Sequence, residues 1–176
     1  EVKVGIILGF TGPIESLTPG MAAGAELAFN EASNSGALLG GSTVSSIRAD
    51  STCIDSAAAA SAAEFLISQG VTAIMGADCS GVTGAVLSNV AVPNGVPMIS
   101  PSATSPALTT AEDNGLFFRT APSDARGGEV LADITSDRGI SSVAITYVNT
   151  DYGVGLADVY EACLLYTSPS PRDQLQ

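Results

Sequence analysis

The chain has 176 residues, 45% of them hydrophobic, which is enough for one domain and part of another. Its formal net charge is −12, and only six residues are lysine or arginine, which argues against nucleic acid or an anionic membrane surface as a partner. The absence of histidine excludes Ser-His-Asp and Cys-His catalysis and removes the commonest zinc ligand. No apolar run reaches about 18 residues, so we expect no membrane insertion.

Both ends of the chain are unusual. Residues 163–173 (CLLYTSPSPRD) match, codon for codon, the translation of a sequencing-library adapter. We interpret 163–176 as an artefact tail, with a genuine Pro/Ser linker as the alternative, and expect the natural chain to continue beyond Ala162. Glu1 follows neither an initiator methionine nor a signal peptide. Either a leader was removed or the fragment begins downstream of one.

Two cysteines, Cys53 and Cys79, remain when the tail is set aside. An even pair in a histidine-free chain suggests a disulfide if the protein is exported, whereas two buried reduced thiols are the alternative. A bridge would close a loop of about 26 residues and stabilise the protein by about 3 kcal/mol in the chain-entropy model.

Strand-like and helix-like segments alternate along the chain. Apolar β-branched runs predict strands, and apolar residues at three- and four-residue spacing predict helices. Asp55 is a good N-cap, and Pro93 and Gly95 are expected to end the third helix. The predicted strands are 2–10, 43–49, 71–76, 96–99, 116–120 and 142–148; the predicted helices are 21–33, 56–69, 80–91 and 124–138, with another opening at Tyr152-Gly153.

This alternation implies βαβ units and therefore an α/β fold with a parallel, doubly wound sheet. The nearly continuous apolar character of the first strand indicates that helices cover both faces of that sheet. A Pro- and Ser-rich stretch at 101–123 then interrupts the pattern. We expect a first lobe over 1–120, a crossover or hinge at 121–123, the start of a second lobe over 124–162, and the artefact tail at 163–176.

Three loops follow the predicted strands, at 9–12, 76–81 and 100–106. Ligands of open parallel sheets bind beyond the carboxyl ends of the strands, where these loops converge. The loops offer small residues, hydroxyls, backbone N–H groups and a helix start, a combination that suits a carboxylate. Phosphate is the competing ligand. However, the sequence contains no P-loop motif, no dinucleotide fingerprint after the first strand and no nucleophile elbow.

Several motifs resemble one family. The segments 78–80 (DCS), 96–109 (VPMISPSATSPALT) and 151–157 (DYGVGLA) resemble the branched-chain amino-acid-binding proteins, the leucine/isoleucine/valine-binding periplasmic components of ABC importers. Gly12-Pro13-Ile14 and Phe117 to Thr120 agree with it, and the order and spacing hold across 1–162. The resemblance implies the type I periplasmic-binding-protein fold, with two lobes that close on a ligand. It also implies a disulfide between Cys53 and Cys79.

The resemblance implies roles for five residues. Ser80 matches a hydroxyl that binds the ligand α-carboxylate, and Thr104 a second hydroxyl at the same head group. The backbones of Ser102 and Asp78 lie at matching positions, and Tyr152 matches an aromatic residue of the second lobe that covers the ligand. Without the resemblance, Ser80 is an ordinary helix N-cap, Thr104 a loop residue and Tyr152 a half-buried aromatic. The loop at 14–20 is longer than the family pattern, so the side-chain preference stays open.

The predicted function is non-enzymatic capture of a small amino acid in the periplasm, with ABC permease subunits as partners, no cofactor and no metal. The full-length form is expected to be monomeric. The alternatives are a sensor or receptor ectodomain, or an amide- or urea-binding protein, on the same fold. A hydrolase using Ser80 or Asp78 is a further alternative, for which only carboxylates or Lys3 could act as the base. Because part of the cleft is missing, we expect residues 1–162 alone to bind poorly and to expose core surface and an unpaired sheet edge.

Overall fold

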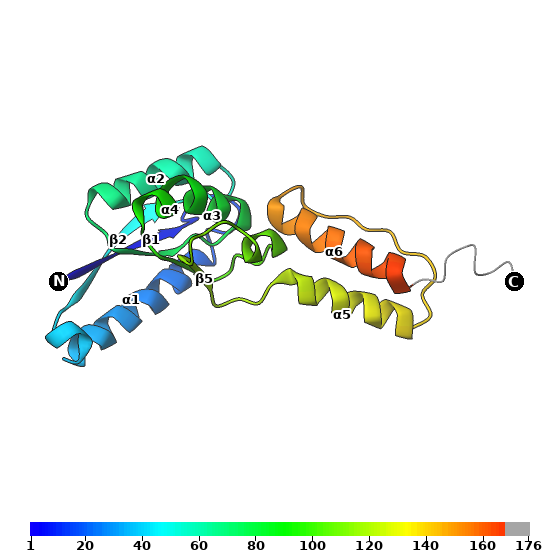
Figure 1. The fold of residues 1–176 in the computed structure, drawn as a ribbon, viewed down its shortest axis with the longest axis horizontal. Coiled ribbons are helices and arrows are strands. Elements are labelled where there is room, and N and C mark those ends of the chain that lie inside the picture. Colours follow the sequence, from blue (N-terminus) through cyan, green and yellow to red (C-terminus); the bar gives the residue numbers. More distant parts are fainter. Residues whose placement is uncertain (168–176) are drawn as a thin grey trace, which may run out of the picture. The chain divides into compact units, whose positions relative to one another are not determined.

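The computed structural model describes residues 1–167, which form two compact units (Figure 1). The first unit comprises Glu1–Ala103 and Ala111–Ala121, and the second comprises Thr104–Thr110 and the chain from Pro122 onward. The chain therefore passes three times between the units. The last of these passages lies within the predicted crossover at 121–123.

A five-stranded sheet forms the centre of the first unit, with strand order β2-β1-β3-β4-β5. Every neighbouring pair is parallel, which confirms the predicted α/β class. Parallel neighbours need crossover connections, and helices or loops supply each of them here (Figure 1). The strands are β1 (Val2–Leu8), β2 (Val44–Asp50), β3 (Ala73–Gly76), β4 (Met98–Ser100) and β5 (Phe117–Arg119).

Helices cover both faces of this sheet, as the continuous apolar character of β1 predicts (Figure 1). Ile7 points to one face and packs in the larger core cluster, whereas Ile6 and Leu8 point to the other. One face carries α2 (Ser56–Ser68), α3 (Ser80–Val86), the π-helical turn η2 (Leu87–Ala91) and α4 (Val92–Asn94); the other carries α1 (Thr18–Asn34). A short 3₁₀ turn, η1 (Leu38–Gly40), lies between α1 and β2.

The starts of α2 and α5 agree closely with the sequence, whereas α1 begins three residues before its predicted start. The Asp55 carboxylate accepts hydrogen bonds from the N–H groups of Ala57 and Ala58, which confirms Asp55 as the N-cap of α2. In the second unit, Ser123 caps α5 (Asp124–Asp137) by accepting from the N–H of Ala125. The cap therefore lies one residue before Asp124, which is the first residue of the helix.

Pro93 does not end the third helix, so that part of the prediction was wrong, whereas the expected end at Gly95 is confirmed. The helical path continues from α3 through η2 and α4, and it ends at Gly95, which has a φ of 65°. Proline lacks an N–H, but it is tolerated in the first turn of a helix, and Pro93 lies in the first turn of α4. The preceding π-helical turn separates α3 from this new first turn.

The predicted strand at 142–148 is also wrong, because none of these residues is in a strand or bridge. A strand needs a hydrogen-bonded neighbour. All five strands of the described chain belong to the first unit, so this segment has no partner. Its apolar side chains stay largely exposed, with Tyr147 at 55% and Val148 at 65%.

Two helices, α5 and α6 (Asp151–Thr167), pack against each other in the second unit. A Cβ on Gly128 would lie 2.6 Å from a methyl of Val159, so the two backbones approach closely there. A hydrogen bond of 2.7 Å joins the hydroxyls of Thr135 and Tyr160. The predicted helix start near Tyr152 is confirmed. The 3₁₀ turn η3 (Pro106–Thr109) belongs to this unit.

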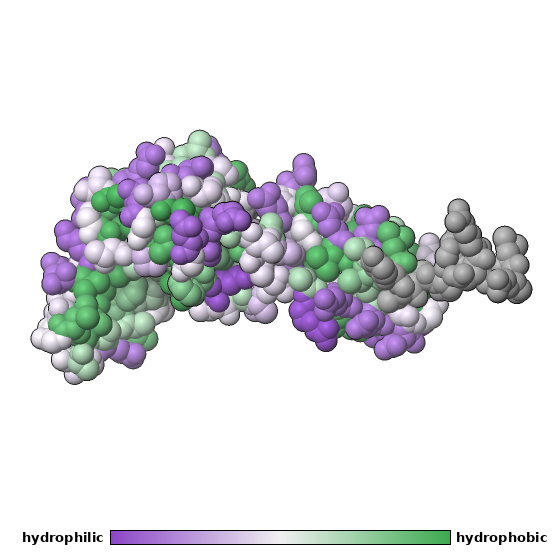
Figure 2. All heavy atoms as spheres, viewed as in Figure 1, coloured by the Kyte–Doolittle hydropathy of each residue, from purple (hydrophilic) through white to green (hydrophobic). Residues whose placement is uncertain are grey.

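The first unit exposes part of its sheet. β5 is an edge strand, and Phe118 and Ile99 are 57% and 45% exposed. These side chains point to the face that carries α1, but α1 packs over β1 and β2. Figure 2 shows hydrophobic surface on both units. The expected open edge and exposed apolar surface are therefore present.

The helix α6 continues across the boundary predicted at Ala162, as far as Thr167. The rest of the predicted artefact tail, 168–176, lies outside the described residues. None of the helices in 1–167 has both the length and the apolar character needed to span a bilayer.

Candidate functional site

The strand order creates a switch point between β1 and β3. The chain leaves β1 toward β2 on one side, then crosses back and continues through β3, β4 and β5 on the other. Loops that leave the carboxyl ends of β1 and β3 therefore diverge, and the crevice between them is where doubly wound sheets bind ligands. The predicted loops at 9–12 and 76–81 begin at this point.

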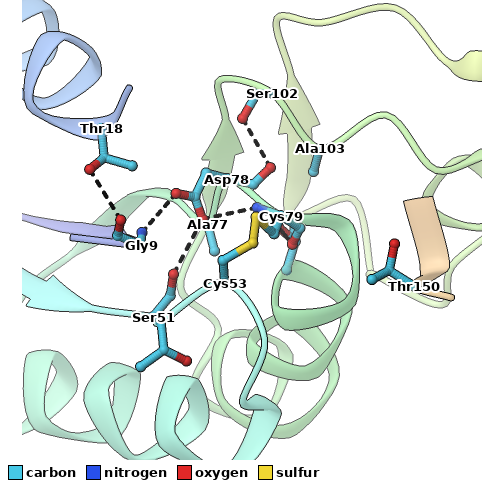
Figure 3. The surroundings of a disulfide bond; sticks show 12 residues. Gly9, Thr18, Ser51, Cys53, Ala77, Asp78, Cys79, Ser102, Ala103 and Thr150 are labelled. Carbon is cyan, nitrogen blue, oxygen red and sulfur yellow. Dashed lines mark hydrogen bonds between the residues drawn. A yellow bond between two sulfur atoms is a disulfide. The ribbon is translucent and has the colours of Figure 1, made fainter. Parts of the chain in front are cut away.

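The side chain of Asp78 occupies the switch point and is only 2% exposed. Its Oδ2 accepts a hydrogen bond of 2.7 Å from the N–H of Gly9. Its Oδ1 accepts from the Ser51 hydroxyl at 3.2 Å and from the N–H of Cys79 at 2.9 Å. Figure 3 shows these contacts converging from the loops after β1, β2 and β3. A buried carboxylate needs such donors, because it costs several kcal/mol without them.

A fourth loop, after β4, joins the same cluster. The Ser102 hydroxyl donates to the carbonyl oxygen of Asp78 at 2.9 Å (Figure 3). The hydroxyl of Ser100, the last residue of β4, donates to the carbonyl of Ala77. The structure thus brings Ser102 and Asp78 together and ties the loop after β4 to the loop after β3.

Ser80 is the first residue of α3 and is 4% exposed. The N-cap is Cys79, whose backbone is extended and whose side chain makes no capping hydrogen bond. The interpretation of Ser80 as an ordinary N-cap was therefore wrong. The first N–H groups of a helix lack intrahelical partners and carry a partial positive charge. Ser80 combines a hydroxyl with this helix start.

The disulfide between Cys53 and Cys79 is confirmed, with an S–S distance of 2.04 Å. It joins the loop after β2 to the residue directly before Ser80 (Figure 3). Cys163 is a third cysteine and is not in a disulfide. The cross-link therefore fixes the loop that presents the start of α3.

Two predicted site residues belong to the second unit. The Thr104 hydroxyl donates to the Asp124 carboxylate at 2.7 Å, and the N–H of Asp124 donates to the carbonyl of Thr104 at 2.9 Å. Tyr152 lies in the first turn of α6 and is 46% exposed. Ser80, Asp78 and Ser102 therefore lie in the first unit, and Thr104 and Tyr152 in the second.

The loops at 9–12 and 76–81, with the part of the loop at 100–106 that belongs to the first unit, together form what we call the rim. Sequence reasoning missed Asp50, which ends β2 beside this rim. Its carboxylate accepts from the Thr11 hydroxyl at 2.6 Å and from the N–H of Thr52 at 2.8 Å. Burial raises the pKa of Asp50, but these hydrogen bonds outweigh it and hold the pKa below its ordinary value. An acidic residue at the carboxyl end of a predicted strand was the available signal.

We expect the stability contribution of Asp50 to depend on pH. Because its pKa is lowered in the folded state, the contribution is present at neutral pH and is lost as pH falls below about 4 toward the folded-state value. The free energy of unfolding of the wild type should therefore exceed that of Asp50→Asn at pH 7 by more than it does in acid. Denaturant titrations of both proteins across this range measure the difference. A difference independent of pH would be contrary to this explanation.

An open hollow of about 400 Å³ lies within the second unit, against the segment that was predicted to form a strand. Its lining mixes apolar side chains of that segment, such as Ile145 and Tyr147, with residues of α6. The hollow lies on an exposed side of this segment, and none of the predicted ligand-binding residues lines it. No group of three or more His, Cys, Asp or Glu residues in 1–167 is arranged to hold a metal ion.

The fold and the rim at its switch point define a class of α/β protein that binds small ligands at the edge of a parallel sheet. A family model described as periplasmic binding protein matches residues 1–164. The chain therefore belongs to the periplasmic binding protein family.

The chain is also similar to individual proteins, and in each case it matches only part of the other protein's length. The Leu/Ile/Val-binding protein homolog 3 of Brucella melitensis is 31% identical over 167 residues, which cover 93% of this chain and 44% of that protein. An ABC transporter substrate-binding protein of Desulfitobacterium hafniense, solved in complex with Leu, is 28% identical with a TM-score of 0.76, covering 94% of this chain and 48% of that one.

A solute-binding protein of R. palustris, in complex with 4-hydroxybenzoate, has a TM-score of 0.81 at 22% identity, covering 96% of this chain and 45% of that one. At this identity the likeness concerns the fold alone. In each comparison, the chain spans less than half the length of the protein it matches.

Proposed function

We propose that the chain is the amino-terminal part of a two-lobed protein that captures a small, branched-chain type α-amino acid and delivers it to an ABC importer. The observation that carries this proposal is the rim at the switch point, where Ser80, Ser102 and the backbone around Asp78 gather beside the start of α3. The similarity to Leu/Ile/Val-binding proteins supports the same ligand class.

The rim suits the α-carboxylate of the ligand. It offers uncharged donors and the positive end of the helix dipole, which together bind an anion without a buried cation. We assign the Ser80 hydroxyl and the first N–H groups of the helical run 80–94 to this carboxylate. We assign the backbones of Asp78 and Ser102 to positions beside it, which the hydrogen bond from the Ser102 hydroxyl to the Asp78 carbonyl supports. The leucine in the complex of the Desulfitobacterium protein has such a carboxylate.

Thr104 suits the other end of an amino-acid head group. Its hydroxyl proton is already donated to Asp124, so the lone pairs of the oxygen are what it can offer a ligand. An ammonium group is a donor only, which matches an accepting hydroxyl beside a carboxylate. We assign Thr104 to the ammonium group and Tyr152 to covering the ligand from the second lobe.

The remaining parts of the proposal concern the whole protein. Residues 1–120 would form the first lobe, 121–123 the hinge and 124–162 the start of the second lobe, with the rest of that lobe encoded downstream. The protein would act in the periplasm without turnover or cofactor, with permease subunits as partners and as a monomer. An artefact origin of 163–176 is part of the same proposal, and the genomic sequence past codon 162 tests it.

Substitution of Ser80 should weaken binding directly. In the complete gene product, Ser80→Ala is expected to reduce leucine affinity by about 1–3 kcal/mol, because a hydrogen bond to a charged group is lost. Isothermal titration calorimetry with leucine measures this. Ser88→Ala is the matched control, because Ser88 lies in the same helical run, is exposed and donates only to the carbonyl of Gly84. Unchanged affinity in Ser80→Ala would remove Ser80 from the site.

The function itself is tested by comparing the complete gene product with residues 1–162. Leucine should bind the complete protein with micromolar or tighter affinity and should be recovered unchanged. Residues 1–162 should bind much more weakly, because the second lobe is largely absent. New products in the incubation would defeat the binding function. Micromolar binding by residues 1–162 would defeat the two-lobed arrangement.

A further inference from the structure

We infer that the side chain of Asp78 is a positioning residue for ligand binding: it holds the loop after β1 and the start of α3 in the arrangement that binds the head group. The inference rests on the proposed function of the rim. In this role the Asp78 carboxylate acts through the two loops and does not contact the ligand, whereas the Asp78 backbone lies beside the ligand in the proposed function.

The carboxylate connects segments that are far apart in the sequence. Gly9, Ser51 and Cys79 follow three different strands, and all three donate to its two oxygens. The contacts from Gly9 and Ser51 are buried and that from Cys79 is partly buried, and Asp78 itself is 2% exposed. The carboxylate therefore fixes the distance between the loop after β1 and the residue preceding Ser80 (Figure 3).

Little room exists for this arrangement to relax. A Cβ on Gly9 would lie 3.2 Å from the Cβ of Cys53 and 3.4 Å from Oδ2 of Asp78, so the loop after β1 is packed directly against the carboxylate and the disulfide. On the other side, the Gly9 carbonyl accepts from the Thr18 hydroxyl at 3.1 Å. Thr18 is fully buried and is the first residue of α1, so this hydrogen bond fixes Gly9 relative to the start of α1.

A carboxylate is the side chain that fits all of these donors. Both of its oxygens accept, whereas an amide offers one acceptor and one donor. In Asp78→Asn the NH₂ group must face the N–H of Gly9 or that of Cys79, whichever way the amide turns. One backbone donor then loses its partner in a buried place, and the loop carrying it must shift. Because the two loops form the rim, the shift reaches the ligand contacts.

The test is Asp78→Asn in the complete gene product, with leucine as the probe. The expected result is a rise of about 10-fold or more in the Kd for leucine, measured at a temperature where the variant is fully folded. Asp113→Asn is the matched control. Its carboxylate also accepts hydrogen bonds from two backbone N–H groups, those of Gly115 and Phe117. These contacts lie at the amino end of β5, whereas the rim lies at the carboxyl ends of the strands.

A purely structural role of Asp78 predicts a different result. Both variants would then lower the melting temperature while both bound leucine with wild-type Kd, and an unchanged Kd in folded Asp78→Asn overturns the inference. Should Asp78→Asn fail to fold, Ser51→Ala replaces it: without the Ser51 hydroxyl the carboxylate loses a contact that fixes the orientation of Oδ1, so its hydrogen bonds to the N–H groups of Gly9 and Cys79 should weaken. A raised Kd in Ser51→Ala supports the positioning role, and an unchanged Kd overturns it.

A second readout separates this inference from the proposed function. Amide hydrogen exchange of Gly9 and Cys79, measured by NMR on the present chain, should accelerate in Asp78→Asn and not in Asp113→Asn. If wild-type protein binds no leucine, isoleucine or valine, the proposed function fails, and the exchange rates alone decide whether Asp78 holds the two loops. Equal exchange in both variants overturns that role.

Discussion

Gly76→Ala should destabilise the first unit by about 3–5 kcal/mol. Gly76 ends β3 with a φ of 125°, a conformation that side chains rarely adopt. An added Cβ would lie 1.9 Å from the carbonyl oxygen of Ile7 on the neighbouring strand β1. The carbonyl is backbone inside a sheet, so it cannot move aside without breaking the strand pairing at the switch point. Urea denaturation followed by circular dichroism measures the loss.

Gly24→Ala supplies the matched control for Gly76→Ala. Gly24 lies in α1, its φ is not positive, and an added Cβ would have no heavy atom within 4 Å apart from its chain neighbours and the backbone of its own helix. The same chemical change should there stabilise the protein by about 0.5–1 kcal/mol, because alanine has a higher helix propensity than glycine. Destabilisation of similar size by the two substitutions would contradict the steric explanation for Gly76.

Removal of the disulfide should cost about 3 kcal/mol of stability. The bond between Cys53 and Cys79 closes a loop over a sequence separation of 26, so Cys53→Ser with Cys79→Ser gives the unfolded chain more freedom. The denaturation midpoint should fall in the double variant. A reducing agent should lower the midpoint of the wild type in the same way and leave the double variant unchanged. A wild-type midpoint insensitive to full reduction would show that the cross-link contributes no stability.

Much of the fold follows from local patterns. Buried parallel strands are apolar along their whole length, so the sequence around Ile6 and Ile7 predicts a strand and its burial on both faces together. Caps are local as well, and Asp55 could be identified from its position before an Ala-rich helix. The alternation of these elements then predicts the parallel sheet.

The errors concern features that depend on neighbours. Residues 142–148 have the composition of a strand, but composition cannot supply the hydrogen-bonded partner that a strand needs. Proline inside a helix usually breaks it, so Pro93 was expected to end this one. The π-helical turn that places Pro93 in a new first turn cannot be predicted from the sequence. In both cases the backbone around the segment, and not its own residue types, determines which secondary structure forms.

The candidate site was predictable as a place but not as a set of contacts. The rule that ligands bind at carboxyl ends of parallel strands selects the loops that hold Ser80 and Ser102. The direction of the Asp78 side chain, into the protein toward Gly9, comes only from the packing of three loops. The pairing of Thr104 with Asp124 likewise joins residues that sequence spacing does not connect.

Recognition of the α-carboxylate by uncharged donors at the switch point is the claim on which the function depends. Calorimetric titration of the complete gene product with leucine and with leucinamide tests it, because the two ligands differ in the carboxylate and share the side chain and the ammonium group. Leucine should bind with micromolar or tighter affinity and leucinamide about 100-fold more weakly, as expected when hydrogen bonds to a charged group are lost. Comparable affinities for the two would show that the rim does not bind the carboxylate.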